Sequence, residues 1–258
     1  MRNRAKFAAA GLAALALLTL GMAISSASGD TVRVGDLVIT LDGGVSPKKL
    51  PKKEPAPISL KLDGTIASAD GSHPPALKTV QVEFDKHGEI DTRGLPTCSV
   101  AKLQSTLTAQ AKRACGSSLV GTGTVSAEIA FPDQAPFSAS GPLLIFNGAP
   151  KGGKKVLIFH VHANVPAPTT FVTTAVISKT SGKYGNSALV QIPTITGGQG
   201  SLTGFNLSIH KTWTYKGKKK SLLLASCPTG TLYAHGSFAF ADGTKAAGDV
   251  VRPCTPGG

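Results

Sequence analysis

The chain has 258 residues, which is enough for one domain with a sizeable core and too few for several large domains. Hydrophobic residues make up 41% of it, which argues against intrinsic disorder, and its 30 glycines and 17 prolines stay below the range of low-complexity chains. Lysine and arginine (27) outnumber aspartate and glutamate (14), which gives a formal net charge of +13. Threonine, valine, serine and glycine are plentiful and favour strands and turns over helices. The composition therefore predicts a basic, β-rich globular protein.

Residues 1–28 have the three parts of a secretory signal peptide. Arg2, Arg4 and Lys6 precede an apolar stretch, and a short run of small residues follows it. We expect cleavage near Ala27, which removes three positive charges and lowers the net charge from +13 to +10. An uncleaved membrane anchor is the alternative. The predicted location is outside the cytoplasmic membrane, either secreted or associated with the cell envelope.

Residues 29–57 are expected to contain an N-terminal strand followed by an arm rich in proline and lysine. The apolar run at 31–41 favours a short strand or hairpin. Four prolines between residues 47 and 57 argue against a central strand and favour an extended, polyproline-like conformation.

Residues 58–258 are predicted to form a single β-rich domain. Val80–Asp85 alternates apolar and polar residues, the period-two pattern of a strand with one buried face. The same pattern recurs at 124–131, 156–164, 170–178, 189–192, 202–210, 222–225 and 232–240, with turn residues between these runs. We predict an all-β fold, either an antiparallel β-sandwich or a strongly curved two-sheet fold, with one short helical insertion near residues 99–114.

The four cysteines all lie in the exported part of the chain, where disulfides persist. Three pairings are possible, and we favour the local one, Cys98–Cys115 with Cys227–Cys254. One continuous helix from residue 98 to 115 would hold those two Cα atoms roughly 25 Å apart, whereas a disulfide requires about 7 Å or less. We therefore expect the helical segment to break at residues 105–108. A zinc site is the alternative, but the chain has no CxxC pair.

Five short runs of the chain are similar to runs found in a known group of proteins. They are 47–51 (PKKLP), 94–98 (GLPTC), 119–123 (LVGTG), 146–148 (FNG) and 192–195 (IPTI). In these runs the chain resembles a family of exported proteins from high-GC Gram-positive bacteria. The resemblance covers most of the mature chain. It implies origin and export, and it carries no known activity.

His160 and His162 form the sharpest chemical motif. On a strand they point to the same face about 7 Å apart, a spacing that zinc enzymes use. A catalytic site would need a third ligand, and His210 and His235 lie on other predicted strands. We instead interpret the pair as part of an outward polar face. No catalytic residue, metal or cofactor is predicted, and His160 and His162 are the candidates if a metal binds.

Lys216, Lys218, Lys219 and Lys220 follow Trp213 and Tyr215 in a predicted hairpin. Lysines beside amphipathic aromatic residues suit an anionic cell-envelope polymer or lipid surface. The alternative is that these lysines only keep a β-rich protein soluble. Nucleic acid is not a predicted partner, because aromatic residues make up only 5% of the chain.

The sequence favours an exported, non-enzymatic structural or binding protein of the envelope or extracellular space. One alternative is a secreted hydrolase that uses a metal at His160 and His162. Another is a carrier of apolar ligands inside a curved sheet. A pocket on which several histidines or acids converge would favour the hydrolase, and an apolar cavity would favour the carrier.

Overall fold

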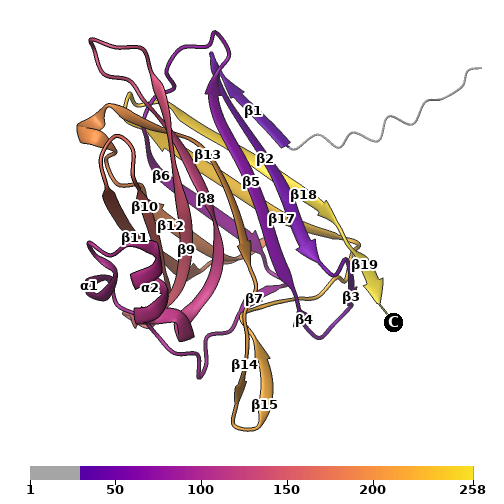
Figure 1. Cartoon of the computed structure of the whole chain (residues 1–258). Coiled ribbons are helices and arrows are strands. Elements are labelled where there is room, and N and C mark those ends of the chain that lie inside the picture. Colours follow the sequence, from indigo (N-terminus) through magenta and orange to yellow (C-terminus); the bar gives the residue numbers. More distant parts are fainter. Residues whose placement is uncertain (1–29, 258) are drawn as a thin grey trace, which may run out of the picture.

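A computed structural model describes residues 30–257, so the expected signal peptide at 1–28 lies outside the described residues. Twelve strands form one antiparallel sheet that curves into a nearly closed cylinder (Figure 1). Their order around the cylinder is β1-β2-β5-β13-β8-β9-β10-β11-β12-β6-β17-β18. The all-β prediction is confirmed, and the facing layers are opposite walls of one continuous sheet.

The strands of this sheet lie close to the runs of period-two alternation. They are β1 (Asp30–Val34), β2 (Leu37–Ser46), β5 (Ser59–Ser68), β6 (Leu77–Asp85), β8 (Leu119–Ile129), β9 (Phe137–Lys151), β10 (Lys154–Ala163), β11 (Thr169–Lys179), β12 (Tyr184–Gln191), β13 (Gly200–Ile209), β17 (Thr231–Phe240) and β18 (Lys245–Pro253).

Because neighbouring strands are antiparallel, the connections fall at two ends of the cylinder. We call one the mouth end; its connections are residues 35–36, 69–76, 130–136, 164–168, 192–199 and 241–244. We call the other the base end; it carries the helices and the short sheets (Figure 1).

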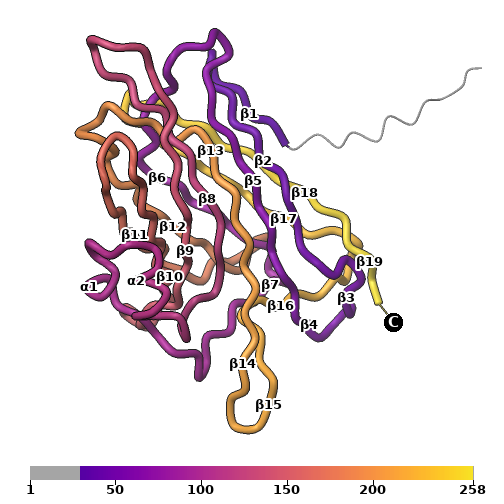
Figure 2. Tube along the Cα trace, viewed as in Figure 1, coloured from indigo at the N-terminus to yellow at the C-terminus, as the bar shows by residue number. Residues whose placement is uncertain are grey.

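The cylinder closes where β1 lies beside β18 (Figure 2). No backbone ladder joins these two described strands, and side chains close the seam instead. Gly248 has no side chain, which allows Val32 of β1 to pack directly against β18. Arg252 of β18 donates to the Asp30 carboxylate at 2.6 Å and to the Gly43 carbonyl oxygen.

Short strands close the base end. They are β3 (Lys49–Pro51), which pairs in parallel with β19 (Thr255–Gly257), and β16 (Leu223–Ala225), which lies between β4 (Ala56–Pro57) and β7 (Gly88–Ile90). The segment expected to be a Pro- and Lys-rich arm therefore lies against the rest of the protein. Leu50 is 1% exposed, and the Cys227 amide donates to the Pro51 carbonyl oxygen at 2.8 Å. The Cys227–Cys254 disulfide, with Cα atoms 6.1 Å apart, joins this layer.

The helical insertion packs on the outside of β9 and β10. It consists of α1 (Val100–Leu103), α2 (Thr108–Cys115) and the short 3-10 helix η1 (Gly116–Ser118). Ser105 lies between α1 and α2 with a φ of 58°, so the helical segment is broken where the cysteine spacing requires it. This break brings the Cα atoms of Cys98 and Cys115 to 5.7 Å, and a disulfide joins them.

Candidate functional site

The interior of the cylinder is apolar and is incompletely filled near the mouth end. A cavity of about 300 Å³, which we call the first cavity, is lined by inward side chains from most of the strands. On β10, Leu157, Phe159 and Val161 point into it, while the residues between them point outward. Among the described residues that line this cavity there is no charged side chain and no histidine.

The connection between β12 and β13, which we call the crossing segment (residues 192–199), passes over the mouth end. Strands β8 to β11 separate β12 from β13 in the sheet, so the chain has to cross the opening to join them. Pro193, Ile195 and Thr196 of this segment line the first cavity. Its 3-10 helix η2 (Thr196–Gly198) has positive φ at all three residues.

Backbone hydrogen bonds fix both ends of the crossing segment. The Ile192 amide donates to the Lys78 carbonyl oxygen, and the Ala130 amide donates to the Gln199 carbonyl oxygen, each at 2.8 Å. The nearby β10–β11 connection contributes Val165, which lines the first cavity and is also 48% exposed. The first cavity therefore reaches the surface beside Val165.

A second cavity of about 180 Å³ lies below the first, toward the base end. Ile58, Ile177 and the strand β16 line it. Six residues line both cavities and form a layer between them, which we call the dividing layer: Leu60, Leu62, Phe84, Leu157, Ala188 and Ile209. The interior thus contains two adjoining apolar chambers stacked along the cylinder.

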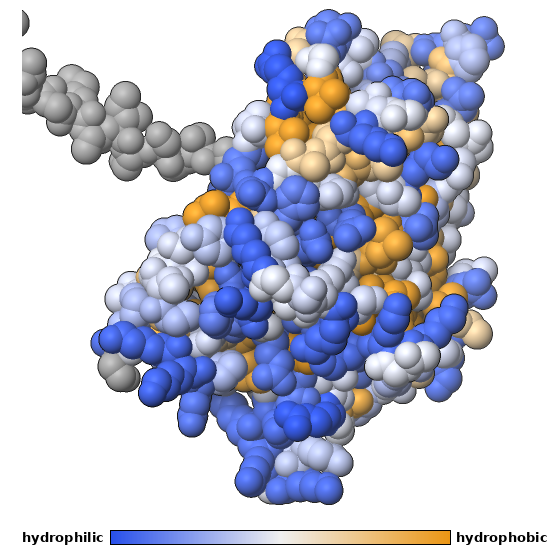
Figure 3. All heavy atoms as spheres, turned by 180° about the vertical axis from the view of Figure 1, so that it is seen from behind, coloured by the Kyte–Doolittle hydropathy of each residue, from blue (hydrophilic) through white to orange (hydrophobic). Residues whose placement is uncertain are grey.

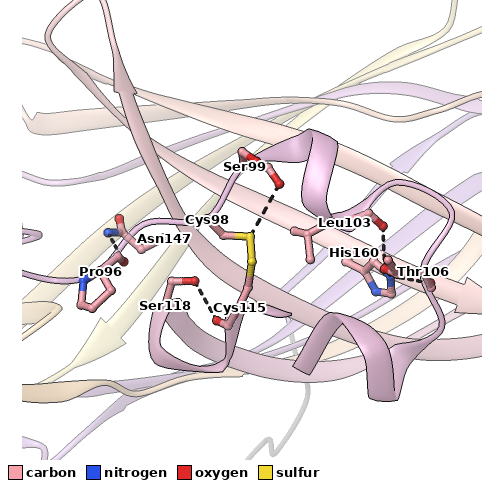
Figure 4. The surroundings of a disulfide bond; sticks show 9 residues. All are labelled: Pro96, Cys98, Ser99, Leu103, Thr106, Cys115, Ser118, Asn147 and His160. Carbon is pink, nitrogen blue, oxygen red and sulfur yellow. Dashed lines mark hydrogen bonds between the residues drawn. A yellow bond between two sulfur atoms is a disulfide. The ribbon is translucent and has the colours of Figure 1, made fainter. Parts of the chain in front are cut away.

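His160 points away from both chambers and lies beneath the helical insertion (Figure 4). Its Nε2 is 2.9 Å from the Thr106 carbonyl oxygen. A carbonyl only accepts, so Nε2 carries the proton, and Nδ1 has no partner among the described residues. Burial lowers the pKa of this imidazole. The outward direction agrees with the sequence, but the helices cover a face that we expected to be exposed.

His162 lies on the same outward face as His160. Its Nδ1 is 2.9 Å from the hydroxyl of Thr170, which in turn donates to the Thr106 carbonyl oxygen. Thr106 therefore connects the two histidines through its backbone. Within residues 30–257, no group of three histidine, cysteine, aspartate or glutamate side chains is placed to hold a metal ion.

The lysine-rich hairpin consists of β14 (Thr212–Tyr215) and β15 (Lys218–Ser221), and it projects from the base end (Figure 1). Its aromatic residues pack against the protein itself. The indole Nε1 of Trp213 donates to the Arg93 carbonyl oxygen at 3.0 Å, and the Tyr215 ring covers Gly94. Gly94 has a φ of +74°, and any side chain there would meet this ring.

The four lysines of this hairpin differ in their surroundings. Lys216, Lys218 and Lys219 are exposed. Lys220 is half-buried, and its Nζ is 3.5 Å from the Asp91 carboxylate. Three of the four residues predicted to contact a polyanion therefore face solvent, and the fourth is engaged inside the protein.

A cluster of Ser201, His73 and Glu128 lies near the mouth end. The imidazole Nδ1 of His73 is 2.7 Å from the Glu128 carboxylate, and its Nε2 is 3.0 Å from the Ser201 hydroxyl. These groups have the order of a nucleophilic triad. The Ser201 hydroxyl, however, lies 2.6 Å from the carbonyl oxygen of Pro74, is buried, and lies outside both chambers. The cluster ties the 69–76 connection to β8 and β13.

Comparisons with protein-family models, with curated proteins and with solved structures find no match. In the part of the chain that the structure describes, no helix has the length and hydropathy needed to cross a membrane. The two disulfides are typical of proteins that mature outside the reducing cytoplasm.

Proposed function

We propose that the protein is an exported, non-enzymatic carrier that binds an apolar ligand in the first cavity. The observation that supports this function is the cavity itself: about 300 Å³ of space inside the sheet, lined by aliphatic and aromatic side chains. Ligand pockets have volumes of about 300–1,000 Å³ and are mostly apolar. The metal-dependent hydrolase has no such support, because His160 and His162 point outward from the chambers.

The exposure of the apolar lining argues for an occupant. The first cavity reaches the surface beside Val165, so its apolar side chains meet solvent when no ligand is bound. Removing apolar surface from water is favourable by about 25 cal/mol per Å². An apolar ligand that fills the space therefore gains free energy from the lining as well as from its own surface.

The lining also restricts the chemistry of the ligand. The polar side chains among the described lining residues are hydroxyls, from Thr65, Ser140, Thr169, Thr173 and Thr196. A carboxylate or ammonium group inside would have no counter-charge, and burying an unpaired charge is strongly unfavourable. The ligand is therefore uncharged where it is buried, and any charged group it carries stays at the mouth end.

Binding of an apolar fluorophore to the mature chain tests this function. We expect N-phenyl-1-naphthylamine to bind with increased fluorescence, and straight-chain alkan-1-ols to displace it. Ala127 of β8 points into the first cavity, so Ala127→Phe should abolish binding in a protein that still folds. The matched control is Thr122→Phe, at an exposed position on the same strand. A folded Ala127→Phe variant with unchanged affinity would refute the carrier function.

The distribution of charge supports a second contact, with an anionic polymer or lipid surface of the cell envelope. The six connections of the mouth end contain Asp36, Asp70, Asp133 and Asp242 and no lysine or arginine. The base end carries lysines at 48, 49, 52, 53, 151, 154, 155, 216, 218 and 219. Figure 3 shows hydrophilic residues over the projecting lower end of the molecule. Such a field orients a protein on a polyanion.

Sedimentation with vesicles that contain phosphatidylglycerol, and with soluble polyphosphate, tests this contact. Binding should weaken steeply with added salt, because exposed charges are screened beyond about 8 Å at physiological ionic strength. The combined variant Lys216→Gln, Lys218→Gln and Lys219→Gln should bind less. A control with the same change in net charge replaces Arg33, Lys78 and Lys245, near the mouth end, by glutamine.

Loss of binding in the base-end variant, with retention in the mouth-end control, would support an oriented contact. Equal loss in both variants would refute it, because net charge alone would then explain binding.

A further inference from the structure

We infer that Phe84 sets the length of the ligand, which is an unbranched aliphatic chain that extends from the mouth end down to the dividing layer. This inference rests on the proposed carrier function and assigns a substrate class and a specificity-determining residue to the same cavity. It follows from the axial length of the first cavity, from the residues that form the dividing layer, and from the second cavity on the far side of that layer.

The first cavity extends along much of the cylinder. Along β10 its lining runs from Ala163 to Leu157, six residues or about 20 Å of strand. Strands of closed sheets tilt by about 40° from the axis, which leaves about 15 Å of axial length. An unbranched aliphatic chain can lie along this length and approaches the dividing layer as it is lengthened, whereas a compact ring system does not lengthen toward that layer.

The dividing layer is a ring at one level of the cylinder. Its members come from β5, β6, β10, β12 and β13, which surround the interior. Five of the six side chains are aliphatic, and Phe84 is the only aromatic one. Its ring is the largest side chain of the layer, and it packs against the core cluster that includes Leu157 and Ile209. Phe84 therefore contributes more than any other residue to the floor of the first cavity.

The space beyond this floor is able to accept more chain. The second cavity has about 180 Å³ and is lined by apolar residues such as Ile58, Leu222 and Leu232. Three charged residues, Asp85, Glu89 and Arg252, also line it. Asp85 already accepts hydrogen bonds from the amides of His87 and Tyr233, and Arg252 is paired with Asp30. At about 30 Å³ for a group of the size of water or a methylene, the second cavity holds about six further methylenes. Removing the Phe84 ring would join the two chambers.

A series of straight-chain alcohols, from octan-1-ol to octadecan-1-ol, tests this inference by displacement of N-phenyl-1-naphthylamine. In the unaltered protein, affinity should rise about fourfold per added methylene until the chain end reaches Phe84, and then stop rising. In Phe84→Ala the rise should continue for about six more methylenes. Phe84→Leu keeps more of the packing and should move the limit by a smaller step.

The matched control is Ile177→Ala, which shortens a side chain that lines the second cavity alone and leaves the dividing layer intact. Its chain-length limit should equal that of the unaltered protein. The same limit in Phe84→Ala and in the unaltered protein would overturn the role of Phe84 and leave the carrier function standing. Failure of every alcohol to bind either protein would overturn both.

Discussion

Replacing Asp91 with asparagine is expected to destabilise the folded protein by about 2 kcal/mol at neutral pH. The Asp91 side chain is 3% exposed and accepts two hydrogen bonds from the Arg93 guanidinium, at 2.8 and 2.6 Å. Its partners Arg93 and Lys220 lower the pKa of this carboxyl from 3.8 to about 2. Each pKa unit corresponds to about 1.4 kcal/mol, which gives the magnitude.

The pH dependence of this contribution has a definite sign. Because the folded-state pKa lies below the unfolded value, the contribution is complete above pH 4 or so and is lost as the pH falls toward 2. At pH 3 about half of it should remain. Urea denaturation of the unaltered protein and of Asp91→Asn, at neutral pH and at about pH 3, measures both values. Trp213, the single tryptophan, reports on this region, because its indole donates to the Arg93 carbonyl oxygen.

Lys220→Gln is the control for Asp91→Asn. It removes the more distant partner, 3.5 Å away, and keeps the Arg93 pair, so it should cost less than about 1 kcal/mol. A loss below about 0.5 kcal/mol for Asp91→Asn at neutral pH, or a loss that does not shrink at low pH, would show that this ion pair does not stabilise the fold.

Two further predictions concern the outer face and the cavity. Burial lowers the pKa of His160. Below about pH 6.5 the imidazole is therefore protonated more readily in the unfolded chain than in the folded protein. The free energy of unfolding should fall as the pH is lowered from about 7 to about 5. His160→Gln should reduce this slope in urea denaturation, and an unchanged slope would assign it to other groups. Gly64→Ala should displace the Phe205 ring into the first cavity, because a Cβ at Gly64 would meet that ring. Fluorophore affinity should then fall severalfold with little change in melting temperature.

The sequence predicts the strands well and the closure of the sheet poorly. Alternation identifies one buried face of β6, β10 and β17, but a sandwich and a closed sheet both bury one face of each strand. The pairing of β13 with β5 and β8 depends on contacts across more than seventy residues, which periodicity does not encode. The break between α1 and α2 was predictable because the distance that a disulfide spans is fixed.

The candidate site was less predictable than the fold, because apolar alternation looks the same whether a core is filled or hollow. The alternation of side chains along β10 places His160 on the outer face. Only the packing of α1 and α2 shows that this face is covered. The cluster of His73, Glu128 and Ser201 has no short sequence motif that would reveal it. Glu128 lies 55 positions and Ser201 lies 128 positions after His73.

Strand number and side-chain size together explain why the interior stays open. The hydrogen bonds between the twelve strands set the width of the sheet, and the contact of β1 with β18 closes it into a cylinder of corresponding girth. Small residues occupy many inward positions of the first cavity, including Ala127, Ala139, Gly141, Ala163 and Ala175. Larger aliphatic residues at these positions would fill the space with no change in the alternation that specifies the strands. The empty volume therefore depends on the identity of a few inward residues, and the same residues are the ones that an apolar ligand would contact.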